Sequence, residues 1–187
     1  MKAVFGLGNP GQRYQGTRHN VGRLVVSTWA KGAGIAIEKR RFSARTGTGE
    51  VSGEKVIVAL PQTYMNLSGR SVISVRDYYH LSPADLIVVY DDMDLGLGRI
   101  RIRSRGGAAG HRGVQSIIDE LDADDFIRLR IGIGRPTAED DDPVDFVLCP
   151  FSPEEQGALP EIVQRAERAL TVLFRDGVDE AMNEFNG

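Results

Sequence analysis

The chain has little of what marks several classes of protein. Among its 187 residues there is one cysteine, Cys149, which excludes an internal disulfide framework and favours a reducing compartment. No run approaches the roughly 18 apolar residues of a membrane-spanning helix. Met1-Lys2 leads directly into an apolar segment, so we expect no signal peptide and a cytoplasmic location. An apolar content of 41% and this length predict one globular domain, residues 1–187.

Motifs for an enzymatic nucleophile are missing as well. The sequence has no G-x-S-x-G elbow and no G-x-x-x-x-G-K phosphate loop. Cys149 follows an apolar run and is expected to be packed and inert. No two of the three histidines have metal-ligand spacing, so we expect no metal. If the protein hydrolyses a bond, the expected nucleophile is water activated by a histidine.

Acidic residues are scarce in one part of the chain and abundant in the other. None occurs from Met1 to Ile37. Through Arg112 there are 17 Lys and Arg against 8 Asp and Glu, and after it 6 against 18. The net charge of −3 therefore hides a basic part, which leaves a nucleic-acid or phosphate partner open.

Arginines recur with period two in the basic part, at 99, 101, 103 and 105. On a strand they would share one face, while Ile100 and Ile102 would point into the core. Lys39-Arg40-Arg41, with Arg45, is a second basic cluster. A solvated sheet face would explain both clusters, but guanidinium groups suit phosphate oxygens, so RNA or another polyanion is the favoured partner.

Strand and helix patterns alternate along the chain, which predicts an α/β sandwich with a twisted, mostly parallel or mixed central sheet flanked by helices. The expected strands are 3–7, 55–60, 86–90, 99–103 and 128–133. The expected helices are 20–31, 66–80, 111–121, one from a capping box at Ser152 to about Arg175 that breaks or restarts at Pro160, and a short last helix. The acidic loop 139–143 is expected to be a solvated turn rather than a metal site.

The stretch VFGLGNPGQRYQGTRHN, residues 4–20, contains glycines in the G-x-G-x-x-G spacing of dinucleotide sites. Such a site needs a helix that starts at the third glycine and an acidic residue about 20 positions further on. Pro10 precedes that glycine, Gly11, and no acidic residue stands at the expected place. A turn with positive φ accounts for the glycines, and a nicotinamide or flavin site is not expected.

The sequence DDMD, residues 91–94, follows the apolar strand LIVVY and stands where α/β proteins build their sites. It can be a magnesium cluster, a carboxylate that orients a histidine base, or a set of caps for a turn. His19 opens a helix, and His111 lies in GGAAGHRG, where a structural role and a site role are both open. His80 is expected to cap a helix or lie on the surface.

Taken together, five islands resemble the bacterial peptidyl-tRNA hydrolase family. They are GLGNPG (6–11) with Tyr14, TRHN (17–20), YMNLSG (64–69), DDMDLGLG (91–98), and GGAAGHRG (106–113) leading to RLRIGIGRP (128–136). Each island alone is weakly specific, but five in order with similar gaps are highly specific. They span most of residues 3–150, and the C-terminal helices match only in general character.

The resemblance implies hydrolysis of the ester between a peptide and the 3′ end of tRNA. It implies that His19 is the general base, that Asp91 orients it, and that Asn9 tells blocked from free amino ends. The family positions of a substrate-binding wall and of tRNA phosphate contacts are also present: Tyr14, Tyr64, Met65 and Asn66 for the wall, Arg101 and Arg130 for the phosphates. The implied partner is peptidyl-tRNA, held at its acceptor stem and 3′ end, with no cofactor and no membrane; we expect a monomer.

These roles agree with elementary chemistry. An imidazole with a reference pKa of about 6.5 can take a proton from water at neutral pH, and a carboxylate on its other nitrogen fixes the tautomer. An ester already has a good leaving group, so no metal is needed. Two positions depart from the family: Arg112 replaces a common asparagine, which adds a charge near the tRNA end, and Tyr90 replaces a frequent histidine. A non-catalytic RNA-binding relative and a dinucleotide oxidoreductase are the alternatives.

Overall fold

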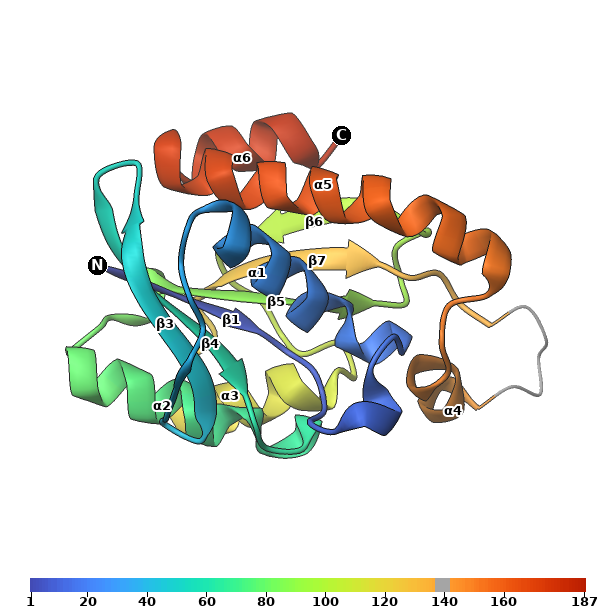
Figure 1. The fold of residues 1–187 in the computed structure, drawn as a ribbon, viewed down its shortest axis with the longest axis horizontal. Helices are drawn as coiled ribbons and strands as arrows, with labels where there is room; N and C mark the ends of the chain where they lie inside the picture. Colours follow the sequence, from blue (N-terminus) through green and yellow to red (C-terminus); the bar gives the residue numbers. More distant parts are fainter. Residues whose placement is uncertain (137–141) are drawn as a thin grey trace.

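A seven-stranded mixed sheet forms the centre of the computed structural model, which describes residues 1–136 and 142–187 (Figure 1). The strand order is β2-β3-β4-β1-β5-β7-β6. β4, β1, β5 and β7 run parallel to one another, whereas β3 pairs antiparallel with β4, and β6 with β7. The strands are β1 (Lys2–Gly6), β2 (Lys39–Arg41), β3 (Ala44–Val51), β4 (Glu54–Pro61), β5 (Leu86–Asp92), β6 (Ile100–Arg103) and β7 (Ile127–Gly132).

Helices cover both faces of the sheet and enclose two apolar cores. One core lies between the sheet and α1, α5 and α6, and the other between the sheet and α2 and α3 (Figure 1). The α-helices are α1 (Val21–Gly32), α2 (Ser68–Tyr79), α3 (Arg112–Leu121), α4 (Pro143–Leu148), α5 (Pro153–Arg175) and α6 (Val178–Phe185). The predicted α/β sandwich with a mostly parallel, mixed sheet is confirmed. None of the helices described is both long and apolar enough to span a bilayer.

The sequence patterns located five of the strands within a few residues and missed β2 and β3. β3 reads ARTGTGEV and lacks an apolar run because two of its positions are glycine. A Cβ atom on Gly47 would lie 2.3 Å from the backbone oxygen of Ala36, and one on Gly49 would lie 2.6 Å from Ile35. The glycines therefore let the segment before β2 pack directly on the strand, which is a tertiary requirement that periodicity cannot reveal.

Two local expectations were wrong. α5 continues through Pro160 without a break. Proline has no N–H to donate to the backbone oxygen of Gln156, but both residues are exposed, so water can replace the lost hydrogen bond. Cys149 is exposed rather than packed, because it ends α4, a helix that the apolar segment alone did not predict. His80 caps α2 at φ 53°, as expected. The expected turn at 139–143 falls mostly on residues 137–141, outside the described part of the chain.

The fold brings the loops that follow β1, β4 and β5 to one end of the sheet. β1 leads to α1 on one face and β4 leads to α2 on the other, so the loops after these neighbouring strands diverge and leave room between them. α1 also approaches β5 very closely: a Cβ atom on Gly22 would lie 2.2 Å from the backbone oxygen of Val89. This contact places the residues before α1 beside the end of β5, where Asp91 lies.

Candidate functional site

A cavity of about 660 Å³ lies at this end of the sheet. Nine of the ten residues that the sequence singled out line it: Asn9, Tyr14, His19, Tyr64, Met65, Asn66, Asp91, Arg112 and Arg130. Arg101 is not among the described lining residues, although it lies directly opposite Arg130 across β6 and β7. The segments that carry these side chains are distant in sequence and converge only through the order of the strands.

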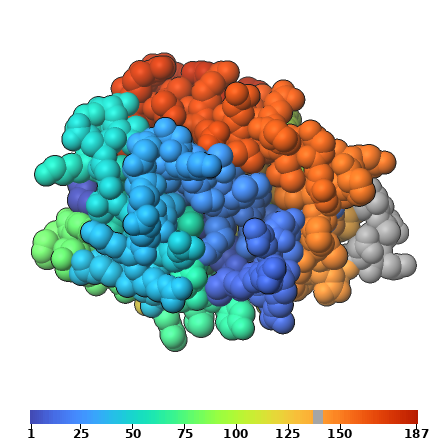
Figure 2. Space-filling model, in the orientation of Figure 1, coloured from blue at the N-terminus to red at the C-terminus, as the bar shows by residue number. Residues whose placement is uncertain are grey.

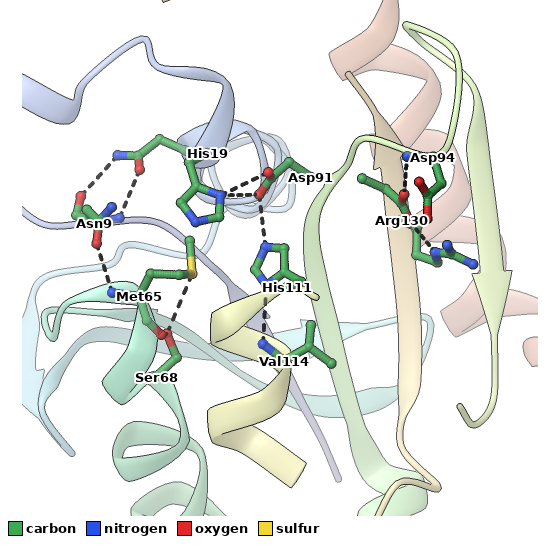
Figure 3. A network of polar contacts seen from close by, with 11 residues as sticks. Asn9, His19, Met65, Ser68, Asp91, Asp94, His111, Val114 and Arg130 are labelled. Carbon is green, nitrogen blue, oxygen red and sulfur yellow. Dashed lines mark hydrogen bonds and ion pairs between the residues drawn. The ribbon is translucent and has the colours of Figure 1, made fainter. Parts of the chain in front are cut away.

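His19 and Asp91 form the buried centre of the cavity. His19 belongs to the 3₁₀ turn Arg18–Asn20 before α1, and Asp91 is the sixth residue of β5. The imidazole Nδ1 lies 2.9 Å from each of the two carboxylate oxygens (Figure 3). An ionised carboxylate only accepts hydrogen bonds, so His19 donates from Nδ1, and its Nε2 is an acceptor without a partner among the described residues.

His111 contacts the same carboxylate from the other side, at 3.0 Å between its Nε2 and Oδ1 of Asp91 (Figure 3). It is also the N-cap of α3, where its Nδ1 accepts the backbone N–H of Val114 at 3.2 Å. A neutral imidazole carries one proton, and because Nδ1 accepts, that proton is on Nε2 and is donated to Asp91. Both roles that the sequence left open for His111, structural and within the site, are therefore present.

The environment keeps Asp91 ionised. Burial alone would raise the pKa of this carboxyl, which is 2% exposed, but the nearby His111 and His19 and their hydrogen bonds outweigh burial and lower the pKa. Burial raises the pKa of Tyr90 to about 12, so the phenol beside the His111 ring is neutral. The site thus combines one buried anion with two imidazoles whose centroids are 5.0 Å apart.

His19, Asp91 and His111 also have ligand atoms close enough together to consider a metal ion. The hydrogen bonds argue against that use. A metal would have to bind the Nε2 atom of His111, which would move the ring proton to Nδ1, where it would clash with the N–H of Val114. The three side chains are therefore better arranged for two imidazole N–H groups that donate to one carboxylate than for binding a divalent cation.

Asn9 is held in a network that uses its amide oxygen. Its Oδ1 accepts the backbone N–H of Met65 at 2.8 Å, which joins the loop after β1 to the loop after β4 (Figure 3). Its backbone exchanges two hydrogen bonds with the side chain of Asn20, at 2.8 and 3.0 Å. Because Oδ1 is engaged, the polar group that Asn9 can offer to the cavity is the Nδ2 donor.

The other predicted wall residues differ in exposure. Met65 is buried, Tyr14 is half-buried, and Tyr64 and Asn66 are exposed at the cavity rim. Arg112, the first residue of α3, is exposed and places a positive charge at the cavity.

Four arginines form two cross-strand pairs on one face of β6 and β7: Arg101 lies opposite Arg130, and Arg103 opposite Arg128. Arg130 pairs with Asp92, and Arg128 is buried among backbone carbonyl oxygens. In the described part of the chain, no carboxylate forms an ion pair with Arg101 or Arg103. The predicted stripe is confirmed for Arg101 and Arg103, which lie on the face of β6 opposite the core residues Ile100 and Ile102. Arg99 and Arg105 lie outside β6, and Arg105 is 3.9 Å from Asp124.

The three aspartates after LIVVY have three different uses. Asp91 holds the two histidines, whereas Asp92 caps the following turn by accepting the backbone N–H of Asp94 at 2.8 Å. Asp94 is at the surface and pairs with Arg135. The magnesium-cluster interpretation is not supported, because these carboxylates are directed to different partners. The glycine loop also lacks dinucleotide geometry, since Gly11 leads into a 3₁₀ turn and α1 begins only at Val21.

Comparison with known proteins gives a consistent result. The family model described as peptidyl-tRNA hydrolase matches residues 3–187. A peptidyl-tRNA hydrolase of Caldanaerobacter subterraneus subsp. tengcongensis is 46% identical over 187 residues, which cover 100% of both chains. One from Desulforudis audaxviator is 48% identical over 186 residues, covering 100% of this chain and 93% of the relative. The crystal structure of peptidyl-tRNA hydrolase from Acinetobacter baumannii matches with a TM-score of 0.92 at 34% identity, over 100% of this chain and 95% of that one. The chain belongs to the peptidyl-tRNA hydrolase family.

Proposed function

We propose that residues 1–187 act as one catalytic domain that hydrolyses the ester between a peptide and the 3′ end of tRNA. The main support for this proposal is the hydrogen bonding of His19 Nδ1 to the Asp91 carboxylate, which leaves Nε2 available to accept a proton within the cavity. Membership of the family supplies the substrate class. We also propose that the enzyme works as a monomer in the cytoplasm and needs no metal.

In the proposed reaction, His19 Nε2 takes a proton from water as the water oxygen attacks the ester carbonyl. Asp91 stabilises the imidazolium that forms, since its carboxylate already accepts from Nδ1. Collapse of the tetrahedral intermediate breaks the bond to the ribose oxygen, which takes the proton back from Nε2. General-base assistance of this kind contributes about 10²- to 10⁴-fold.

Asn9 supports a preference for blocked amino ends. Its oxygen is engaged by the Met65 amide, so it offers only N–H donors to a ligand. A peptide or acyl carbonyl next to the ester accepts such a bond, whereas the N–H groups of a free ammonium and of the Asn9 amide are both donors and cannot bond to each other. Tyr64, Met65 and Asn66, with Tyr14, are proposed to line the path of the peptide and the terminal nucleotide.

The arginine face of β6 and β7 supports binding of the tRNA backbone. Like charges directly opposite one another destabilise a sheet, and Arg101 and Arg103 have no carboxylate ion pair within the described residues. Phosphates supply the missing negative charge, and Arg forks fit their oxygens. Because the grooves of A-form RNA hide base edges, we propose that the acceptor stem is recognised by shape and backbone.

The test is a turnover assay with N-blocked and free aminoacyl-tRNA side by side, in the presence of a chelator. We expect release of the blocked amino acid only, undiminished by the chelator, and no turnover with folded His19→Ala. Full activity of that variant would remove His19 as the base, and loss of activity with chelator would show a metal requirement. Binding of tRNA without turnover would instead support the non-catalytic RNA-binding relative.

A further inference from the structure

Arg18, the residue before His19, has a buried side chain that is directed away from the catalytic pair. Its guanidinium lies between two rings, 4.2 Å from the centroid of Phe146 and 5.5 Å from that of Phe151. Its Nη1 donates to the backbone oxygens of Phe146 at 3.3 Å and Pro150 at 2.9 Å. One side chain thus holds the last turn of α4 and the linker that follows it.

An ion pair extends this contact to α5. The Nη2 atom of Arg18 lies 2.5 Å from Oε2 of Glu155, and the same oxygen accepts the backbone N–H of Ser152 in the capping box of α5. The backbones also meet, since the N–H of Arg18 donates to the oxygen of Cys149 at 3.1 Å. In Figure 2 the N-terminal loop, in dark blue, is in direct contact with the orange α4–α5 segment.

An arginine at this buried position has a free-energy cost that packing alone would not require. The buried Nε of Arg18 has no hydrogen-bond partner within the described residues, and a buried cation is costly to desolvate. An apolar side chain would fill the space between the two rings without either cost. What arginine adds is a rigid fork that binds three acceptors at once, one on α4, one on the linker and one on α5.

His19 has contacts of its own that hold it in position. Its ring is held by Asp91, and its neighbour Asn20 is held by two bonds to the backbone of Asn9. α4 has only six residues, and it presents Val144, Val147 and Leu148 to the cavity. Two of these are partly exposed, Val144 at 40% and Leu148 at 36%, so they form an apolar wall that is open to solvent.

We propose that Arg18 is a positioning residue that fixes α4 against the catalytic loop and thereby sets the apolar wall that the substrate contacts. It acts on substrate affinity rather than on proton transfer. The affinity part rests on the proposed function, whereas the clamping of α4 is independent of it.

The test combines hydrogen exchange with kinetics on Arg18→Gln, Arg18→Lys and Arg168→Gln. Arg168→Gln is the matched control because it breaks an exposed ion pair with Glu184, and neither residue lines the cavity. In Arg18→Gln we expect faster amide exchange over 143–149 and unchanged exchange over 19–25. KM for an N-blocked aminoacyl-tRNA should rise roughly tenfold with kcat and its pH profile unchanged, while Arg18→Lys recovers part of the affinity.

Each other outcome contradicts a named part of the proposal. Unchanged exchange over 143–149 would overturn the clamp. A fall in kcat with unchanged KM would mean that Arg18 acts through His19 and not through α4, and faster exchange without a change in KM would overturn the role of the wall. If Arg18→Gln does not fold, Glu155→Gln serves, since its amide oxygen can still accept the Ser152 N–H while the ion pair is lost. Absence of turnover in the wild type would refute the proposed function but leave the exchange result valid.

Discussion

Asp91→Asn would change the proton position on His19 without changing the shape of the site. The amide oxygen must face His111, whose Nε2 is a donor because Val114 occupies its Nδ1. The new Nδ2 group then replaces Oδ2, 2.9 Å from Nδ1 of His19. Nδ1 of His19 lies 2.9 Å from both oxygens of Asp91, so it could keep donating to the amide oxygen; we expect it instead to accept from the buried amide N–H, which moves the imidazole proton to Nε2 and removes the base. A wrong tautomer of this kind lowers kcat on the order of 10⁴-fold in a histidine–aspartate system.

The same substitution should leave the protein folded. It replaces charge-assisted hydrogen bonds, worth about 1.5–3 kcal/mol each, by neutral ones worth about half as much, so a loss of about 2 kcal/mol is expected. For a domain of this size that lowers Tm by roughly 4–8 °C. Since domains are stable by about 5–15 kcal/mol, most molecules remain native at 25 °C and the loss of activity reports chemistry.

The assay is single-turnover hydrolysis of an N-blocked aminoacyl-tRNA, with ¹⁵N NMR of the histidines to observe the tautomer. Asp92→Asn is the matched control, because the adjacent carboxylate pairs with Arg130 rather than with a histidine. We expect its kcat to stay within a few-fold of the wild type. If Asp91→Asn keeps more than a tenth of the wild-type rate, or if His19 still carries its proton on Nδ1, the tautomer argument is wrong.

Four further outcomes are expected. The pKa of the Asp91 carboxyl is lowered in the folded protein, so its contribution to stability is complete above the unfolded-state pKa of about 3.9 and is lost as the pH falls through the lower folded-state pKa. In urea unfolding between pH 5 and 2, the free energy of unfolding should therefore fall more steeply for the wild type than for Asp91→Asn. Arg101→Glu should weaken tRNA binding and flatten its salt dependence, and an unchanged slope in filter binding would make the arginine face a merely solvated one. Arg112→Asn should lower the slope of log K against log salt by about one if this side chain contacts a phosphate. Gly22→Ala should destabilise by roughly 1–3 kcal/mol in urea titrations, because its Cβ would overlap β5, whereas Gly32→Ala, with no neighbour within 4 Å, should be neutral or better.

The sequence could locate much of this site because the fold obeys a simple rule. The strand-end rule itself pointed only to Asp91, and the family resemblance added Asn9 and Met65. All three lie together because the residues after the carboxyl ends of the neighbouring parallel strands β1, β4 and β5 meet. Periodicity also found the arginine face, because a strand with alternating Ile and Arg has only one way to bury its apolar side.

What the sequence could not predict depends on close approach and on contacts between distant segments. β3 was not predicted because its glycines are required only by the close packing of Ile35 and Ala36 against them. Arg18 and Glu155 are 137 positions apart, and each has an adequate local explanation, one as part of TRHN and the other as part of a capping box. No pattern within either segment indicates that the two are one contact.

His111 shows how a local structural feature can decide chemistry elsewhere. The N–H of Val114 is one of the unpaired donors at the start of α3, and His111 satisfies it as any N-cap would. That bond leaves Nε2 as the only place for the ring proton, and the proton in turn binds the Asp91 oxygen that also faces His19. The cap of α3 therefore directs a donor at the carboxylate before any substrate arrives. A capping residue of another type at this position would satisfy α3 equally well and leave Asp91 with one partner fewer, so capping preference alone does not account for a histidine at this position.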